Sequence, residues 1–312
     1  MRGAAIGLFF LSPLVAEYLL GNVPFEAVPW LGFLAPMYGG GALLIREFAR
    51  HTGRGWRAMI PLAAAYGLLE AGILDQSLFN PSYEGFDFQY PAHVPVLGIS
   101  AYHAVTFIAG HVIWSISVPI ALVESLSKHP TEPWLGRRGI AVTAVVFVLG
   151  DLLIFAGHQD ANGFMARPHQ LIGVAVLIAV LITVACRRWA AAAADSRPAP
   201  RPVRVAVAAL LTTSTAFLMP EGWLAVAVIG SLYVAALLLV PALSRRAGWD
   251  ARHRLALAGG ALLSYCWLGF SLLTMTGSGS ALNLAGQGVL VVAAIVLLTL
   301  ATWRVRSSAK AV

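Results

Sequence analysis

Charged residues are scarce in this chain of 312 residues: Asp, Glu, Lys and Arg make up 11% of it, whereas hydrophobic residues make up 59%. A soluble domain of ordinary composition has about 25% charged residues and roughly half apolar ones, so water is not the main solvent of this chain. The apolar residues fall in runs of about 17 to 25, the length that crosses a hydrocarbon core. The composition therefore excludes an ordinary soluble domain and predicts an integral membrane protein in contact with a lipid bilayer.

Cysteine is also rare, and its placement excludes two kinds of site. Cys186 and Cys266 lie far apart in apolar sequence, outside any CxxC or Cys/His pattern. A disulfide framework and a cysteine-based zinc site are therefore not expected, and we interpret both residues as packing residues.

Lysine is nearly absent, with 2 Lys against 19 Arg, and alanine is abundant. This bias is typical of a GC-rich bacterial genome, so we expect a protein of a bacterial cytoplasmic membrane. The net charge is +7, but the basic residues form short clusters between apolar runs instead of following one helix face. Such clusters indicate membrane topology, and no nucleic-acid partner is expected.

The apolar runs predict an all-α bundle of about ten transmembrane helices. Each run is bounded by Pro, Gly or charged residues, and boundaries of this kind are good to a few residues. The predicted spans are residues 4–21, 27–49, 57–77, 97–126, 138–157, 169–186, 203–219, 222–243, 254–274 and 284–303.

The charged residues between the spans predict the orientation. When the connections are assigned alternately to two sides, 20 of the 21 Lys and Arg residues fall on one side and only Arg167 falls on the other. Basic connections stay in the cytoplasm, so both termini are expected there. The opposite side has the longest outer loop, residues 80–97, with Tyr83, Phe86, Phe88 and Tyr90. Two interpretations of these rings stay open: an aromatic belt at the headgroup level, and a lid or contact surface for a substrate.

One low-complexity segment divides the chain. Residues 190–202 are rich in Ala, Pro and Arg, which is typical of a flexible linker, here on the cytoplasmic side. We therefore predict a bundle with most of the buried charge in residues 1–189 and an apolar scaffold of four helices in residues 203–312.

Ionisable residues at membrane depth cluster in the first five spans. Such groups cost several kcal/mol unless they are paired or hydrated, so each is a candidate for function. Counted along the spans at about 1.5 Å per residue, these side chains fall in the middle or the outer half of the bilayer. The residues are Glu17, Glu70, Asp75, His103, His111, Asp151 and His158.

The overlapping depths favour one shared site that faces outward. Asp151 and His158 fall within about 20° of the same face of the fifth span, and His103 and His111 are about 80° apart on the fourth. Carboxylates and imidazoles that meet at one depth can ligate a divalent metal such as zinc and activate a water molecule. The metal candidates are Glu70, His103, His111 and His158. A proton or ion pathway and a purely structural polar network remain alternatives.

Two short motifs give the first interpretation a more specific form. Residues 107–111 read FxxxH, and residues 158–162 read HxxxN; both follow Glu70 in the chain. This order resembles the glutamate-dependent intramembrane proteases of the CAAX type. That resemblance implies that Glu70 activates water, that His111 and His158 assist, and that Asn162 helps to hold the transition state. The paired glutamates of that family correspond here to Glu70-Ala71, and Asp75 stands in place of its arginine.

Three function classes follow from these residues. The first is an intramembrane hydrolase of a lipid-linked or membrane-embedded substrate, with Glu70, His111 and His158 as catalytic residues. Its binding residues would be Glu17, Asp75, His103, Asp151 and Asn162. The second is a transporter or ion-coupled permease, whose polar residues would continue to the cytoplasmic face. The third is a membrane subunit without catalytic activity.

Charged residues near the cytoplasmic ends of the spans have simpler interpretations. Glu47 beside Arg46 is expected to be an ion pair at the membrane edge. Glu124 is expected to extend toward water or to pair with Lys128, four residues further along its helix.

Overall fold

A computed structural model describes residues 1–83, 85–189 and 193–310, without the side chains of 308–310. Its long helices are α1 (Arg2–Pro13), α2 (Leu31–His51), α3 (Trp56–Leu69), α4 (Ala101–Gly110), α5 (Val118–Leu126), α6 (Arg137–Asn162), α7 (Pro168–Cys186), α8 (Pro202–Leu218), α9 (Trp223–Leu243), α10 (Ala251–Met275) and α11 (Ala281–Lys310). Four short helical segments extend them: η1 (Leu14–Leu19), η2 (Phe25–Trp30), η3 (Glu70–Leu74) and η4 (His111–Ser117). The short strands are β1 (His93–Val94), β2 (Ile99–Ser100), β3 (Asp195–Pro198) and β4 (Arg246–Ala247).

The predicted multi-pass helical bundle is confirmed. Over the described residues, nine helical segments are long and apolar enough to cross a membrane, and α8 is an apolar helix of 17 residues. α1 continues into η1, α3 into η3, and α4 through η4 into α5, so each of these runs forms one span. The ten predicted spans therefore correspond to ten helical segments, of which α8 is the shortest.

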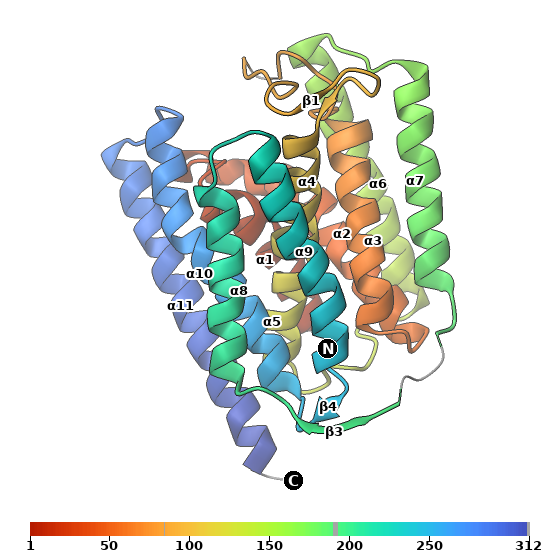
Figure 1. The fold of residues 1–312 in the computed structure, drawn as a ribbon, viewed down its shortest axis with the longest axis vertical. Coiled ribbons are helices and arrows are strands. Elements are labelled where there is room, and N and C mark those ends of the chain that lie inside the picture. The colour runs from red at the N-terminus through yellow and green to blue at the C-terminus, as the bar shows by residue number, and fades with distance from the viewer. Residues whose placement is uncertain (84, 190–192, 311–312) are drawn as a thin grey trace.

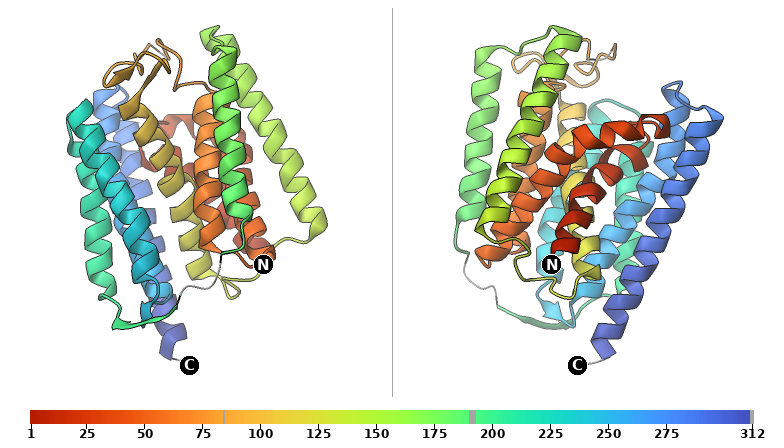
Figure 2. Two further views of the ribbon diagram at one scale, coloured as in Figure 1. Left: turned by 45° about the vertical axis from the view of Figure 1, so that its right-hand side comes forward. Right: turned by 180° about the vertical axis from the view of Figure 1, so that it is seen from behind.

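The helices form three groups side by side. α1 to α5 lie in the middle, with α6 and α7 on one side and α8 to α11 on the other (Figures 1 and 2). The start of α1, the end of α11 and the pair β3–β4 lie toward one end of the bundle, which we call the basic end. The connection between η3 and α4, which contains β1 and β2, lies at the other end, which we call the loop end. The outer helices expose Leu and Val side chains along their length, as a surface in contact with lipid requires.

The two predicted halves pack against each other. α10 contacts α5 and η1, and α11 contacts α5 and η2. Gln287 of α11 is almost fully buried and donates to the Leu19 carbonyl at 2.8 Å. Asn283, equally buried, accepts from the Glu26 amide at 3.1 Å. The last four spans therefore contribute buried amide side chains that satisfy the backbone of the first two.

The segment expected to be a flexible linker is partly ordered, which corrects that expectation. Residues 190–192 lie outside the described residues, but Asp195–Pro198 pairs in parallel with Arg246–Ala247. The amides of Asp195 and Ala199 donate to the carbonyls of Arg245 and Ala247 at 3.0 and 2.8 Å. Composition alone favours disorder because Ala, Pro and Arg bury little surface. The partner strand, about fifty residues away in the sequence, supplies the hydrogen bonds that order the segment.

Hydrogen exchange tests whether the segment Asp195–Pro198 pairs with Arg246–Ala247. The amides of Asp195 and Ala199 should exchange at least about tenfold more slowly than the rate of a free chain, because each donates to a carbonyl. Hydrogen bonds and charge from Arg197 lower the pKa of Asp195, and a carboxylate with a lowered pKa stabilises the folded form until the pH falls through that pKa. The slow exchange of these two amides should therefore persist at and above neutral pH. Exchange of both amides at the free-chain rate at pH 7 would show that the segment is undocked.

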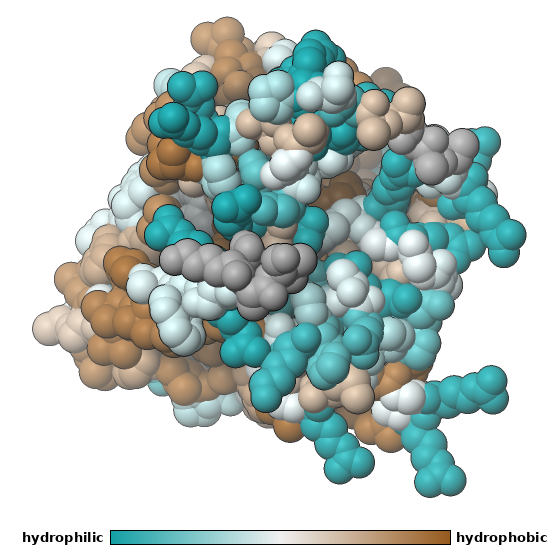
Figure 3. Space-filling view, turned by 90° about the horizontal axis from the view of Figure 1, so that it is seen from below, coloured by the Kyte–Doolittle hydropathy of each residue, from teal (hydrophilic) through white to brown (hydrophobic). Residues whose placement is uncertain are grey.

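Hydrophilic side chains gather over the middle and the right-hand part of the basic end (Figure 3). Beneath this surface, Arg46 is fully buried; its Nε lies 3.1 Å from Glu124, and its guanidinium stacks over the Trp134 ring at 3.4 Å. Arg50 also binds Glu124, at 2.5 Å, and Glu47 accepts from the Trp134 amide at 2.9 Å. We call Arg46, Glu47, Arg50, Glu124 and Trp134 the arginine cluster.

The arginine cluster corrects two expectations. Glu124 pairs with Arg46 and Arg50 of α2 and not with Lys128. The Arg46–Glu47 pair is present, but it is buried in the bundle instead of lying at an exposed membrane edge. The side chains reach across α2, α5 and the connection to α6, and burial is tolerated because each charge has several hydrogen-bonding partners.

The orientation can be tested with single cysteines at opposite ends of the bundle. Ser82, near the loop end, and Ser196, beside β4, are both exposed. In intact cells, and with Cys186 and Cys266 removed, a cysteine at Ser82 should react with an impermeant thiol reagent, whereas one at Ser196 should react only after lysis. The reverse labelling would invert the predicted topology.

Candidate functional site

Three spans are wound more loosely than an α-helix where they carry their buried ionisable residues. The π-helical segment η1 contains Glu17, η3 begins at Glu70, and η4 begins at His111. Such segments are rare and are frequent at functional sites, because an extra residue in a turn re-aims the side chains around it. Their coincidence with Glu17, Glu70 and His111 marks the centre of the bundle as the candidate site.

These side chains form one hydrogen-bonded chain across four spans. Tyr38 of α2 donates to Glu17 Oε1, and its hydroxyl lies 3.1 Å from Glu70 Oε1. The second oxygen of Glu70 lies 2.6 Å from His111 Nε2, and His111 Nδ1 lies 3.1 Å from the Ser115 hydroxyl. The predicted proximity of Glu70 to a histidine of the fourth span is confirmed. We call these five residues the acid–base chain.

The acid–base chain has more hydrogen-bond acceptor atoms than hydrogens whose positions are fixed. A tyrosine hydroxyl has one hydrogen and donates to one acceptor at a time, yet Tyr38 contacts both Glu17 and Glu70. The second contact is a hydrogen bond only when one of the two carboxyl groups carries a proton. His111 likewise holds a hydrogen on either ring nitrogen or on both. The arrangement is therefore suited to holding and moving a proton between carboxyl and imidazole groups.

The local sequence explains why η4 and α1 meet at this point. Pro119 lacks an N–H, and its ring clashes with the carbonyl four residues earlier, that of Ser115. Ser12 of α1 compensates, since its hydroxyl donates to the Ser115 carbonyl at 2.6 Å. On the other side, a β-carbon at Gly67 would lie 3.0 Å from His111 Cβ. Glycine at that position lets α3 approach η4 closely enough for Glu70 to reach His111.

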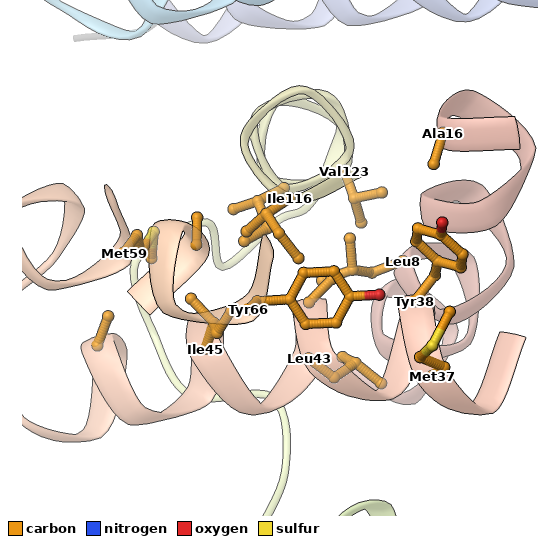
Figure 4. Packing of buried hydrophobic residues seen from close by; sticks show 14 of the residues in the cluster. Leu8, Ala16, Met37, Tyr38, Leu43, Ile45, Met59, Tyr66, Ile116 and Val123 are labelled. Atoms are coloured by element: carbon orange, nitrogen blue, oxygen red, sulfur yellow. The ribbon is translucent and has the colours of Figure 1, made fainter. Parts of the chain in front are cut away.

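A compact apolar layer lies between the acid–base chain and the arginine cluster. Tyr38 and Arg46 are eight residues apart on α2, about 12 Å along the helix. Leu43 and Ile45 lie between them in the sequence and pack with Ile116 and other buried side chains in one core (Figure 4). Along this stretch of α2, apolar side chains therefore separate the acid–base chain from the arginine cluster.

A second group of polar residues lies nearer the loop end. The Tyr83 hydroxyl is 3.3 Å from Asp75 Oδ2 and 3.4 Å from His158 Nε2, and the Tyr83 ring stacks on the His158 ring. Asp75 and His158 both interact electrostatically with Glu70. Asn162 donates to the His158 carbonyl, one turn earlier in α6. The structure thus brings His158 and Asp75 together through Tyr83, on the loop side of the Glu70–His111 pair.

The aromatic residues of the outer loop pack on one another and on two histidines. Phe88 contacts Tyr83, His103 and Phe107, with ring centroids 5.6, 4.9 and 5.2 Å away. Tyr90 differs, being 75% exposed. Three of the loop's four aromatic rings, those of Tyr83, Phe86 and Phe88, therefore belong to a cap over the loop end.

His103 and Asp151 occupy separate positions. His103 Nδ1 lies 2.9 Å from the Phe88 carbonyl, so this histidine anchors the outer loop, which corrects its expected place beside His111. The two histidines are eight positions apart, which corresponds to about 12 Å along the helix, so a similar facing angle does not bring them together. Asp151 is buried and interacts electrostatically with Glu70, and its Oδ1 has no hydrogen-bond partner among the described residues.

A metal centre is one interpretation of the sequence. Of the four proposed ligands, Glu70 and His111 are in contact, while His103 and His158 lie in the aromatic cap. Over the part of the chain that the structure describes, no group of three His, Cys, Asp or Glu residues is placed to hold a metal ion. Metal binding stays a prediction.

Tyr38 is the main residue of the site that sequence reasoning missed. Tyrosines are common in transmembrane helices as interfacial anchors, and Tyr38 is uncharged, so it did not stand out. The adjacent run Gly39-Gly40-Gly41 allows α2 to pack closely on α1, because a β-carbon at Gly39 would overlap the backbone of Phe9. A buried tyrosine beside such a run, at the depth of two glutamates, is the signal that could have found it.

Comparison with known proteins identifies the family but not its activity. A protein-family match covers residues 7–311 and is to an uncharacterized membrane protein family. The chain belongs to this family. No curated protein and no solved structure matches it. The resemblance to CAAX-type proteases is not supported by these comparisons, whereas membership of this membrane protein family agrees with the multi-pass bundle.

Proposed function

We propose that this protein is an intramembrane hydrolase in which Glu70 and His111 form the acid–base pair. The observation that carries the proposal is the 2.6 Å contact between these side chains inside the bundle, held from both sides by Tyr38 and Ser115. The side chains of His111 and Glu70 keep 13% and 11% of their surface exposed. The substrate class is a membrane-embedded or lipid-linked ester, thioester or amide.

The pair suits hydrolysis of a carbonyl compound. Glu70 would take a proton from a water molecule as the water oxygen bonds to the carbonyl carbon, and His111 would return a proton to the leaving group as its bond to that carbon breaks. Tyr38 and Glu17 hold Glu70 in position and keep an exchangeable proton beside it. His158 and Asp75, joined by Tyr83, lie on the loop side, where a substrate would enter.

The distribution of polar residues favours a site with a single opening. A permease needs polar residues that continue to both faces, whereas here Leu43, Ile45 and Ile116 place apolar side chains between the acid–base chain and the arginine cluster. The predicted orientation directs the loop end outward. We therefore place substrate entry in the outer leaflet, beside the aromatic cap.

Incorporation of heavy oxygen tests the proposal for any substrate of this class. The purified protein would be reconstituted with total membrane extract from its own cells in water enriched in ¹⁸O. Hydrolysis should place ¹⁸O in the acid product of one lipid or membrane peptide, as measured by mass spectrometry. Absence of any protein-dependent ¹⁸O label would contradict the proposal.

A proton-coupled permease is the second candidate, and the continuity of the acid–base chain favours it. Glu17, Tyr38, Glu70 and His111 are linked without a break, as a proton pathway requires. Liposomes containing the protein and a trapped pH dye distinguish the two candidates. Proton flux that depends on Glu70, in the absence of ¹⁸O incorporation, would favour the permease.

A further inference from the structure

A cavity lies at the basic end, away from the acid–base chain. Its volume is about 490 Å³, within the range of small-molecule sites. Its wall comes from the starts of α3 and α10, the ends of α5 and α11, and the connection after α5. The lining includes Trp56, Glu124, Lys128, Asp250, Arg254 and Arg304.

The charges around this cavity leave a positive excess. Both oxygens of Glu124 already bind arginines of the arginine cluster, at 3.1 and 2.5 Å. Asp250 is engaged by Arg252 at 2.7 Å and by His253 at 3.0 Å. The two acidic residues in the wall therefore already have partners outside it. Arg254 interacts electrostatically with both of them, and the exposed Lys128 adds a further positive charge to the wall.

Two hydrogen-bond donors of the wall have no acceptor among the described residues. Arg254 is half-buried and interacts electrostatically with Glu124 and Asp250, but neither carboxylate is within ion-pair distance of it. The indole N–H of Trp56 is buried and likewise has no acceptor in the described chain. A buried donor without an acceptor costs about 1–3 kcal/mol, so the Trp56 indole favours a ligand oxygen, and the charge of Arg254 favours an anionic ligand with several such oxygens.

We propose that this cavity binds the phosphate headgroup of an anionic phospholipid from the leaflet at the basic end. Phosphate oxygens match the guanidinium of Arg254 and the ammonium of Lys128. The cavity lies between helix ends at the basic end of the bundle, and Ala121, Trp56 and Val305 give it an apolar side for the glycerol and the first methylenes. Basic pockets between transmembrane helices on the cytoplasmic side recognise lipid headgroups in this way. The site is independent of the proposed hydrolase activity.

Native mass spectrometry of the full-length protein in detergent tests the proposal. The probes are dioleoyl phosphatidylglycerol, dioleoyl phosphatidylcholine and inorganic phosphate alone. We expect phosphatidylglycerol to bind at least about tenfold more tightly than phosphatidylcholine, because the two lipids differ in net charge. The variant Arg254→Gln should weaken phosphatidylglycerol binding at least about tenfold. Arg306→Gln, an exposed arginine on the same side of the bundle, is the matched control and should bind as the wild type does.

Each remaining outcome decides one part of the proposal. Equal binding of phosphatidylglycerol by Arg254→Gln and the wild type would overturn the site. Binding of inorganic phosphate as tight as that of phosphatidylglycerol would overturn the lipid as the source of the phosphate group. If Arg254→Gln does not fold, Lys128→Gln serves instead, because Lys128 is exposed at the rim. That variant should lose about fivefold in affinity, and an unchanged affinity would overturn the site.

Discussion

Replacing Arg46 with alanine is expected to lower the free energy of unfolding by about 3–5 kcal/mol, because the change leaves buried carboxylates without their cation. Arg46 is fully buried, lies 3.1 Å from Glu124, and donates to the carbonyls of Pro130 and Glu132 at 3.0 and 2.7 Å. Its loss also removes the stacking on Trp134. Unfolding by SDS in mixed detergent micelles measures the change.

Arg137→Ala is the matched control for this substitution. Arg137 is exposed at the start of α6, close in the sequence to Trp134, so its removal should change the free energy of unfolding by no more than about 0.5 kcal/mol. A variant Arg46→Ala as stable as Arg137→Ala would show that the arginine cluster does not hold α2, α5 and the following connection together.

Replacing Glu70 with glutamine is expected to reduce the rate of ¹⁸O incorporation by about 10²–10⁴-fold, the usual contribution of a general base. Glutamine keeps the volume of the side chain and can still hydrogen-bond to Tyr38 and His111, but it cannot accept a proton from water. The fold should persist, with a melting temperature within a few degrees of the wild type. The rate and the melting curve are measured on the same preparation.

Glu221→Gln is the control for the loss of a carboxylate. Glu221 is exposed in the connection between α8 and α9, far in the sequence from the acid–base chain, and its replacement should leave the rate unchanged. Equal rates for Glu70→Gln and Glu221→Gln would remove Glu70 from the chemistry. A large loss of stability with no effect on the rate of the remaining folded protein would assign Glu70 a structural role.

The sequence predicts the bundle and part of the site because the membrane imposes strong rules on it. Apolar run length gives the spans, and the cost of a buried charge directs Glu70 and His111 toward each other. The rise and rotation per residue of an α-helix predict the depth and facing angle of each side chain. The similar facing angles of His103 and His111 suggested one site, but their separation along the helix axis keeps them apart. The π-helical turns at Glu17, Glu70 and His111 are not predictable from these rules, since they depend on contacts such as that of Ser12 with the Ser115 carbonyl.

The remaining differences come from partners that are distant in the sequence. Glu124 has Lys128 four residues away on its own helix, yet it binds Arg46 and Arg50 of another helix, 78 and 74 residues away. The segment Asp195–Pro198 has the composition of a disordered chain and is ordered by Arg246–Ala247. Composition and periodicity report which groups need partners. They do not identify the partners when several elements compete for them.

The most direct test of the Glu70–His111 pair is a comparison of ¹⁸O incorporation by Glu70→Gln, His111→Ala and the double variant. Two residues that act as a unit lose most of the rate in either single variant, and the double variant is then no slower than the slower single. We predict that result. Losses that multiply in the double variant, or a single variant that retains most of the wild-type rate, would contradict the account of Glu70 and His111 as one acid–base pair.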